Sequence, residues 1–203
     1  MLEINGRTVL SRLIESLRPH VKGVRVVVGY REDLVIGLCA SLHRDVVIVR
    51  NPEFRTTNTV QSMAMGARGL SGKVLFLDGD LIVEPGSLSH FIAKAADVPS
   101  LVAVAPSRSE NPVNVVVDGP ESRMLVTRFT RDAGHPYEWA NVVAGPADMM
   151  DGAEGYVFQR LEEHLPLDAA LLDLREVDTP ADLELAKAFA LQVDEQGALR
   201  ARA

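Results

Sequence analysis

Two hydrophobic periods alternate along the chain. Short continuous apolar runs predict buried strands, and between them apolar residues recur every three or four positions, which predicts amphipathic helices. The predicted strands cover residues 24–28, 45–49, 74–77, 101–104 and 138–143. The predicted helices cover residues 8–19, 32–43, 85–96 and 153–164, and two more start near Asn58 and at Pro180. This alternation indicates an α/β fold with a doubly wound, mostly parallel mixed sheet, helices on both faces, and strand 74–77 near its centre.

One segment departs from this rhythm. Residues 113–117 and 124–129 are both strand-like, and the turn residues Asp118-Gly119-Pro120 lie between them. This arrangement predicts an inserted β-hairpin. A hairpin beside the ligand-binding edge of the sheet would form one wall of a substrate pocket.

The apolar run 74–77 stops at two carboxylates, Asp78 and Asp80, which are separated by Gly79. Ligands of open α/β sheets bind at the carboxyl ends of the strands, so the two acids are placed as a metal or phosphate site would be. Asp-Gly is also a common turn pair. The residues alone leave a turn and a binding site equally open.

Two helix starts are further candidates for chemistry. The polar loop 51–58 ends at Thr57 and Asn58, where free helix amides could hold an anion or a base edge, although capping alone explains these residues better. Asp178 lies just before Thr179 and Pro180, a strong helix start. Taken alone, Asp178 is better explained by stabilisation of the helix dipole.

Composition limits the classes of function. The chain has 203 residues, of which 47% are hydrophobic, which suits one sizeable core. We expect one domain over residues 1–192 and a fraying C-terminal tail over residues 193–203. A formal charge of −7 argues against a nucleic-acid partner. The single Cys39 excludes an internal disulfide, and no signal peptide, membrane span or lipidation motif is apparent, so we expect a cytoplasmic protein with no membrane partner.

Five segments, taken in order, resemble the nucleotidyltransferase superfamily with the GT-A-like fold. They are Ile4–Leu10, Val26–Tyr30, Asn51–Met63, Leu77–Asp80 and Val177–Leu183. Each is a weak match alone, but their order and spacing are specific for the superfamily. They also resemble its sugar-phosphate and phosphocholine cytidylyltransferase-type branch, the MobA-like NTP transferases.

The resemblance implies transfer of a nucleoside monophosphate, with CMP favoured, from an NTP to a phosphate- or phosphonate-bearing small molecule, with release of pyrophosphate. Such a reaction depends mostly on placing the acceptor oxygen and neutralising charge at the α-phosphorus, for which Mg²⁺ held by carboxylates is suited. Asp80 and Asp178 match the two metal-ligand positions of the family. Asp78 would be an additional ligand or would support the others.

The resemblance also implies which residues lie near the substrates. Asn58 and Ser62 match residues placed near the base and ribose, and Thr57 adjoins them. Tyr30 and Trp139 fall at loops that could face the nucleotide and the acceptor. The expected partners are an NTP, with CTP favoured, and a small phospho- or phosphono-acceptor.

One element of the family has no counterpart in the sequence. The family begins with a strand and a glycine-rich loop, which precede the segment matching Leu2–Asn5 and cradle the triphosphate with backbone amides. Without this strand we expect an exposed apolar groove in the sheet, or a domain partner or homodimer that covers it. We also expect poor nucleotide binding and turnover without the loop.

Two other functions stay open. A GT-A glycosyltransferase would use Asp78 and Asp80 to hold a nucleotide-sugar diphosphate through a divalent metal. A non-catalytic nucleotide-binding pseudoenzyme would account for the absent loop. The helix starts at Asn58 and Asp178 favour the nucleotidyltransferase. Release of pyrophosphate, release of a nucleoside diphosphate, or binding without product would separate the three.

Overall fold

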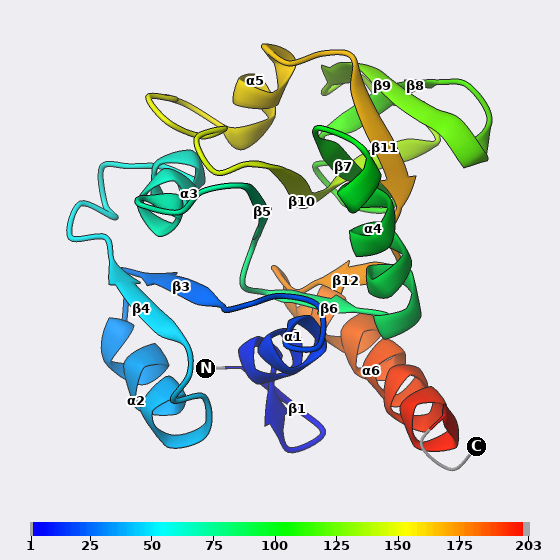
Figure 1. Cartoon of the computed structure of the whole chain (residues 1–203). Helices are drawn as coiled ribbons and strands as arrows, with labels where there is room; N and C mark the ends of the chain where they lie inside the picture. Colours follow the sequence, from blue (N-terminus) through cyan, green and yellow to red (C-terminus); the bar gives the residue numbers. More distant parts are fainter. Residues whose placement is uncertain (1, 201–203) are drawn as a thin grey trace.

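The computed structural model describes residues 2–200, with side chains as far as residue 196, and it has the α/β architecture that the sequence predicts. Its main sheet has six strands in the order β5-β10-β7-β11-β9-β8 (Figure 1). The sheet is mixed, because β11 runs parallel to β7 while the other neighbouring pairs are antiparallel. These strands are β5 (Lys73–Leu77), β7 (Leu101–Pro106), β8 (Asn114–Asp118), β9 (Met124–Thr130), β10 (Tyr137–Pro146) and β11 (Leu167–Leu171).

Three strand pairs lie outside this sheet. The parallel pair is β3 (Arg25–Val28) with β4 (Val47–Arg50). The antiparallel pairs are β6 (Leu81–Val83) with β12 (Leu174–Glu176), and β1 (Glu3–Ile4) with β2 (Arg7–Thr8). The pair β8 and β9 forms the predicted hairpin, joined through a short 3-10 helix, η1 (Glu121–Arg123).

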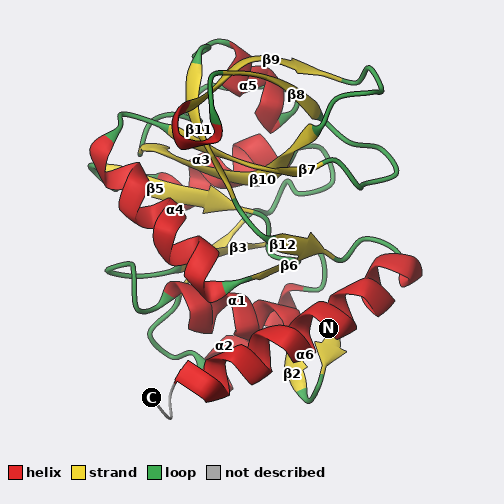
Figure 2. Ribbon diagram, turned by 90° about the vertical axis from the view of Figure 1, so that its right-hand side faces the viewer, coloured by secondary structure: helices red, strands yellow, loops and turns green. Residues whose placement is uncertain are grey.

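Helices cover both faces of the sheet, as the sequence predicts (Figure 2). The helices of the described residues are α1 (Val9–Leu17), α2 (Glu32–Leu42), α3 (Thr59–Ala67), α4 (Pro85–Asp97), α5 (Val157–Glu162) and α6 (Pro180–Arg200), of which α3 and α5 pack on one face of the sheet and α1 and α4 on the other. The short α5 occupies only the middle of the predicted helix 153–164. Within the described part of the chain, none of these helices combines the length and apolar character that crossing a bilayer requires.

Alternating residues of the strands build two cores. In β7, Val102 and Val104 face a core that includes Val60 and Met63 of α3, whereas Ala103 faces the opposite core. The second core is filled by α4 and α1, with Leu88, Phe91 and Leu13 buried in it. Such two-sided burial explains why the strands read as continuous apolar runs.

Strand β5 does not lie at the centre of the sheet, where the sequence analysis expected it. It is the edge of the six-stranded sheet, and β3 and β4 form a separate sheet. No strand of the described residues pairs with the free edge of β5 or with that of β3. Beside β3 there is instead a mostly apolar groove of about 320 Å³, whose lining includes Val26, Val27, Val9 and Leu10.

Most of the expected C-terminal tail is helical in the structure. Helix α6 continues to Arg200, and Asp194 in it accepts hydrogen bonds from the buried Arg12 at 2.8 and 3.0 Å. Arg7 also pairs with Asp194. The helix is therefore tied to α1, while residues 201–203 lie outside the described residues.

Candidate active site

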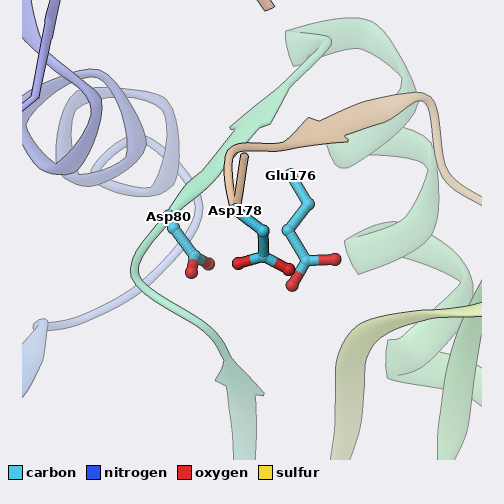
Figure 3. Close-up of side chains that lie close together, drawn as sticks. All are labelled: Asp80, Glu176 and Asp178. Atoms are coloured by element: carbon cyan, nitrogen blue, oxygen red, sulfur yellow. The ribbon is translucent and has the colours of Figure 1, made fainter. Parts of the chain in front are cut away.

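Three carboxylates converge where the β6–β12 ribbon leaves the end of β5. Because Glu176 pairs with Leu81, it lies next to Asp80, and Asp178 follows two residues later. One oxygen of each side chain lies within 4.8 Å of the others. Figure 3 shows Asp80, Glu176 and Asp178 pointing toward one another. Asp80 and Asp178 thus meet, as the sequence analysis expected, and Glu176 joins them.

The electrostatics of this cluster are unfavourable without a cation. Burial, followed by the charges of Asp80 and Asp178, raises the pKa of Asp78 to about 7. Burial and then the charge of Asp178 raise the pKa of Glu176 to about 8, although a hydrogen bond from Asn141 opposes the shift. Burial raises the pKa of Asp80 as well. Like charges held this close favour protonation unless a positive charge compensates them.

The cluster has the chemistry of a site for a hard divalent cation. Its donors are all carboxylate oxygens, the ligands that Mg²⁺ and Mn²⁺ prefer. Oδ1 of Asp80 is buried and accepts no hydrogen bond from any described residue. Since buried polar atoms rarely lack a partner, this oxygen fits a metal ligand. The donor set therefore suits the Mg²⁺ that the resemblance implies.

Asp78 has a different position from the other three acids. It is partly buried, and burial and then the charges of Asp80 and Asp178 raise its pKa, but it is not a member of the close group of three. The close group of three acids therefore joins Asp80 to Glu176 in β12 and to Asp178 just after it, and leaves Asp78 out. This arrangement differs from an Asp-x-Asp pair that holds a cation alone.

Tyr30 lies on the same groove as the cluster. The groove beside β3 is lined by both Tyr30 and Asp80, and Tyr30 is 76% exposed. Its ring lies against Phe54, with ring centroids 6.4 Å apart. A Cβ on Gly29 would come within 2.5 Å of Phe54, so the glycine permits this close packing. The groove thus connects the acids to an exposed aromatic ring and, through Phe54, to loop 51–58.

The buried Asn51 connects Thr57 in loop 51–58 to Ser62 in α3. Its Nδ2 donates to Oγ1 of Thr57 at 2.9 Å and to Oγ of Ser62 at 3.0 Å. The backbone amide of Asn58 donates to Oε1 of Gln61 at 2.9 Å, which caps the start of α3. These contacts fix the shape of the loop, and roles of its residues in binding base or ribose stay a prediction. Sequence reasoning did not single out Asn51.

Trp139 lies in the core. It is 8% exposed and packs edge-on against Phe129, with centroids 6.4 Å apart. Its Nε1 is buried without a hydrogen-bond partner among the described residues. The ring therefore offers no open face to a nucleotide, and its expected contact with substrate has no support in this geometry.

Glu176 and Asn141 are the members of the site that sequence reasoning missed. A signal for Glu176 was present, because residues two apart on an extended segment face the same side, and Glu176 precedes Asp178 by two. No comparable signal exists for Asn141, whose Nδ2 donates to Oε1 of Glu176 at 2.9 Å. That contact joins residues of different strands.

Comparison with known proteins decides the family. Residues 1–156 match the family described as the MobA-like NTP transferase domain. The chain belongs to this family. The region of the chain that matches the MobA-like family contains β5 and the following Asp80. Glu176 and Asp178 lie beyond the end of the matched region.

Curated proteins and solved structures are similar to this MobA-like chain. The bifunctional protein GlmU of Methanococcus vannielii is 24% identical over 180 residues, which are 86% of this chain and 40% of that protein. The CMP-5'-(3-aminopropyl)phosphonate synthase of Streptomyces rubellomurinus is 29% identical over 132 residues, 64% of this chain and 20% of that protein. The chain thus spans less than half the length of either relative.

Among the solved structures with the same fold is that of CMP:2-keto-3-deoxy-manno-octonic acid synthetase in complex with CTP. It superposes with a TM-score of 0.74 at 16% identity, over 94% of this chain and 90% of that one. At this identity the likeness shows the shared fold.

Proposed function

We propose that the protein is a metal-dependent nucleotidyltransferase that moves a nucleoside monophosphate from an NTP to a phosphate- or phosphonate-bearing small molecule and releases pyrophosphate. The observation that carries this proposal is the convergence of Asp80, Glu176 and Asp178 within 4.8 Å in a MobA-like fold. When bound, Mg²⁺ would supply positive charge to the triphosphate, which lowers the barrier to attack at its α-phosphorus.

The residues of the chain would hold and orient the reactants. Asp80, Glu176 and Asp178 would be the cation ligands, and Asp78 would be a partly buried carboxyl that supports them. An oxygen of the acceptor forms a bond to the α-phosphorus, and the bond from the α-phosphorus to the bridging oxygen breaks. The electron pair leaves with pyrophosphate. Because a phosphate monoester is largely dianionic at neutral pH, the acceptor oxygen needs no base from the chain.

CMP is the nucleotide that the comparisons favour. One relative is named for a CMP-phosphonate product and the solved structure for a CMP-sugar synthetase with bound CTP. We extend this preference to the present chain as a proposal. The exposed ring of Tyr30, which lines the same groove as Asp80, would face the nucleotide. Thr57 and Asn58 at the end of the loop, and Ser62 in α3, would lie near the base and ribose.

The groove beside β3 would complete the phosphate site. Its lining includes Val28 and Gly29 at the end of β3 and extends to Gly79 and Asp80. We propose that an extended strand followed by a glycine-rich turn occupies it, because β3 and β5 each have one edge with no partner among the described strands. Backbone amides of such a turn would meet the triphosphate next to the acids.

The test is pyrophosphate release with CTP, UTP, ATP or GTP, Mg²⁺, and a panel of phospho- and phosphono-acceptors. The chain of residues 1–203 is compared with a chain extended at its N-terminus by a strand and glycine-rich loop. We expect the extended chain to be faster, CTP to be preferred, and Asp80→Asn to abolish activity while the exposed Asp118→Asn leaves it unchanged.

Each other outcome identifies a different error. Full activity of residues 1–203 would show that no glycine-rich element is needed. An active Asp80→Asn variant would show that the reaction does not require the carboxylate of Asp80. Release of a nucleoside diphosphate would identify a glycosyltransferase, and nucleotide binding without product in both chains would identify a pseudoenzyme.

A further inference from the structure

Asn141 has an unusual backbone conformation for its position. It has a φ of +54° inside β10. The left-handed region is unfavourable for residues with a Cβ, although Asn tolerates it better than most. Among the described residues, Asn5 and Arg31 are the other non-glycine residues with positive φ, and they lie in the β1–β2 turn and just before α2. Asn141 is the one of these three that lies within a strand.

The strand irregularity aims the side chain of Asn141 at the acids. The pairing of β10 with β7 is interrupted between Trp139 and Val143, and such irregularities commonly redirect a side chain next to an active site. Since Val142 pairs with Leu77 at the end of β5, Asn141 lies one step further, at the level of Asp78.

Asn141 touches one oxygen of one carboxylate. Its Nδ2 donates to Oε1 of Glu176 at 2.9 Å. The amide is neutral, so it adds no charge to the site and does not repel a cation. Binding Oε1 fixes the orientation of a long, flexible side chain and leaves Oε2 free of this contact. The unfavourable positive φ of Asn141, beside a carboxylate of the site, indicates that the structure requires this side chain there.

We propose that Asn141 is a positioning residue, which orients Glu176 so that this carboxylate is ready to bind the divalent cation. The inference rests on the proposed metal-dependent function. Groups that hydrogen-bond to metal ligands typically contribute 10- to 100-fold to metal affinity. Loss of the Asn141 amide should therefore weaken cation binding without removing a ligand.

The test measures Mn²⁺ affinity by electron paramagnetic resonance of the free ion, without nucleotide. Asn141→Gly removes the amide and keeps a residue that adopts positive φ freely. The matched control is Asn5→Gly, the same change at another left-handed asparagine. We expect about 10- to 100-fold weaker Mn²⁺ binding for Asn141→Gly and wild-type affinity for Asn5→Gly. Far-UV circular dichroism of both variants in EDTA should match the wild type.

A double-mutant cycle identifies the route of the effect. In a Glu176→Gln background, Asn141→Gly should change Mn²⁺ affinity less than about 3-fold, because the residue that it orients no longer carries the ligand charge. An equal loss in both backgrounds would show that Asn141 acts independently of Glu176 and would overturn the inference. If Asn141→Gly binds Mn²⁺ as tightly as the wild-type protein does, the positioning role of Asn141 is overturned while the metal site stands. If the wild-type protein binds no Mn²⁺, the metal site itself is overturned.

Discussion

Neutralising Asp80 should stabilise the metal-free protein. Asp80, Glu176 and Asp178 place their oxygens within 4.8 Å of one another, and Oδ1 of Asp80 is buried without a hydrogen-bond partner in the described structure. Asp80→Asn removes one charge and keeps the shape of the side chain. Asp80, which the proposed function requires, is therefore expected to lower the free energy of unfolding of the metal-free protein.

The size of the effect follows from the separation. Two unit charges at 4.8 Å repel by about 3.5 kcal/mol at an effective dielectric constant of about 20, and by about 0.9 kcal/mol at the value of about 80 for water. The cluster is partly exposed, so its effective dielectric constant lies between these values. We expect Asp80→Asn to raise the free energy of unfolding by about 1–3 kcal/mol at pH 9 in EDTA.

The effect should depend on pH in a defined direction. The pKa of Asp78 is raised to about 7 and that of Glu176 to about 8. Folding therefore takes up protons at these groups, and the metal-free wild type should lose stability as pH rises from about 4 through 8. At pH 5 both groups are mostly protonated in the folded protein, so the gain from Asp80→Asn should shrink.

Urea denaturation measures this effect. Unfolding is followed by circular dichroism and by fluorescence of Trp139, the single tryptophan, at pH 5 and pH 9 in EDTA. Asp118→Asn, at an exposed position, is the control for a change in net charge. Saturating Mn²⁺ should reverse the order, because wild type binds it more tightly. Destabilisation by Asp80→Asn in EDTA at pH 9 would refute the reasoning.

Two further predictions concern the scaffold. Arg12 lowers the pKa of Asp194 by a hydrogen bond, so Asp194→Asn should cost about 1 kcal/mol at pH 7, after allowance for exposure. That contribution is lost as the pH falls below about 4 through the lowered pKa; an equal cost at pH 2 in urea denaturation would contradict it. Gly29→Ala should cost about 1–3 kcal/mol, since its Cβ would meet Phe54 at 2.5 Å. At Gly37 in α2, an added Cβ would meet no atom within 4 Å beyond its chain neighbours and the backbone of its own helix. Gly37→Ala should therefore raise the free energy of unfolding by up to about 1 kcal/mol, and thermal unfolding of both variants measures the difference.

The elements that the sequence predicts well are those whose local pattern and tertiary burial agree. Strands such as β3 and β7 are apolar on both faces, and the hairpin β8–β9 has turn residues between two strand-like runs. Strand β11 was missed because Leu-Asp-Ala-Ala-Leu has no β-branched residue. Its pairing with β7 and β9 overrides that weak propensity.

Long-range contacts explain the other differences. The last part of α6 reads as a polar tail, but Asp194 is bound by Arg12, a residue near the other end of the chain. The position of β5 at a sheet edge depends on which of the described strands pair with it, and periodicity cannot reveal that. The local pattern therefore predicted where α6 begins but not where it ends, and it predicted strand β5 but not which strands pair with it.

The candidate site divides in the same way. Asp80 and Asp178 follow from the resemblance, and the fold brings them together. The position of Glu176 beside Asp80 depends on the register of β12 with β6, and the direction of the Asn141 side chain depends on an irregularity in β10. Neither the register nor the irregularity can be read from local sequence. Trp139 was expected at a loop, but pairing with β7 draws it into the core.

The most direct test of the nucleotidyltransferase assignment is the fate of the α-phosphorus of CTP. The N-terminally extended chain is incubated with CTP, Mg²⁺ and a phosphono-acceptor, and the products are resolved by phosphorus NMR. The account predicts a CMP unit joined to the acceptor, one pyrophosphate for each, and neither with Asp80→Asn. Formation of CDP, or an undiminished yield with Asp80→Asn, would contradict it.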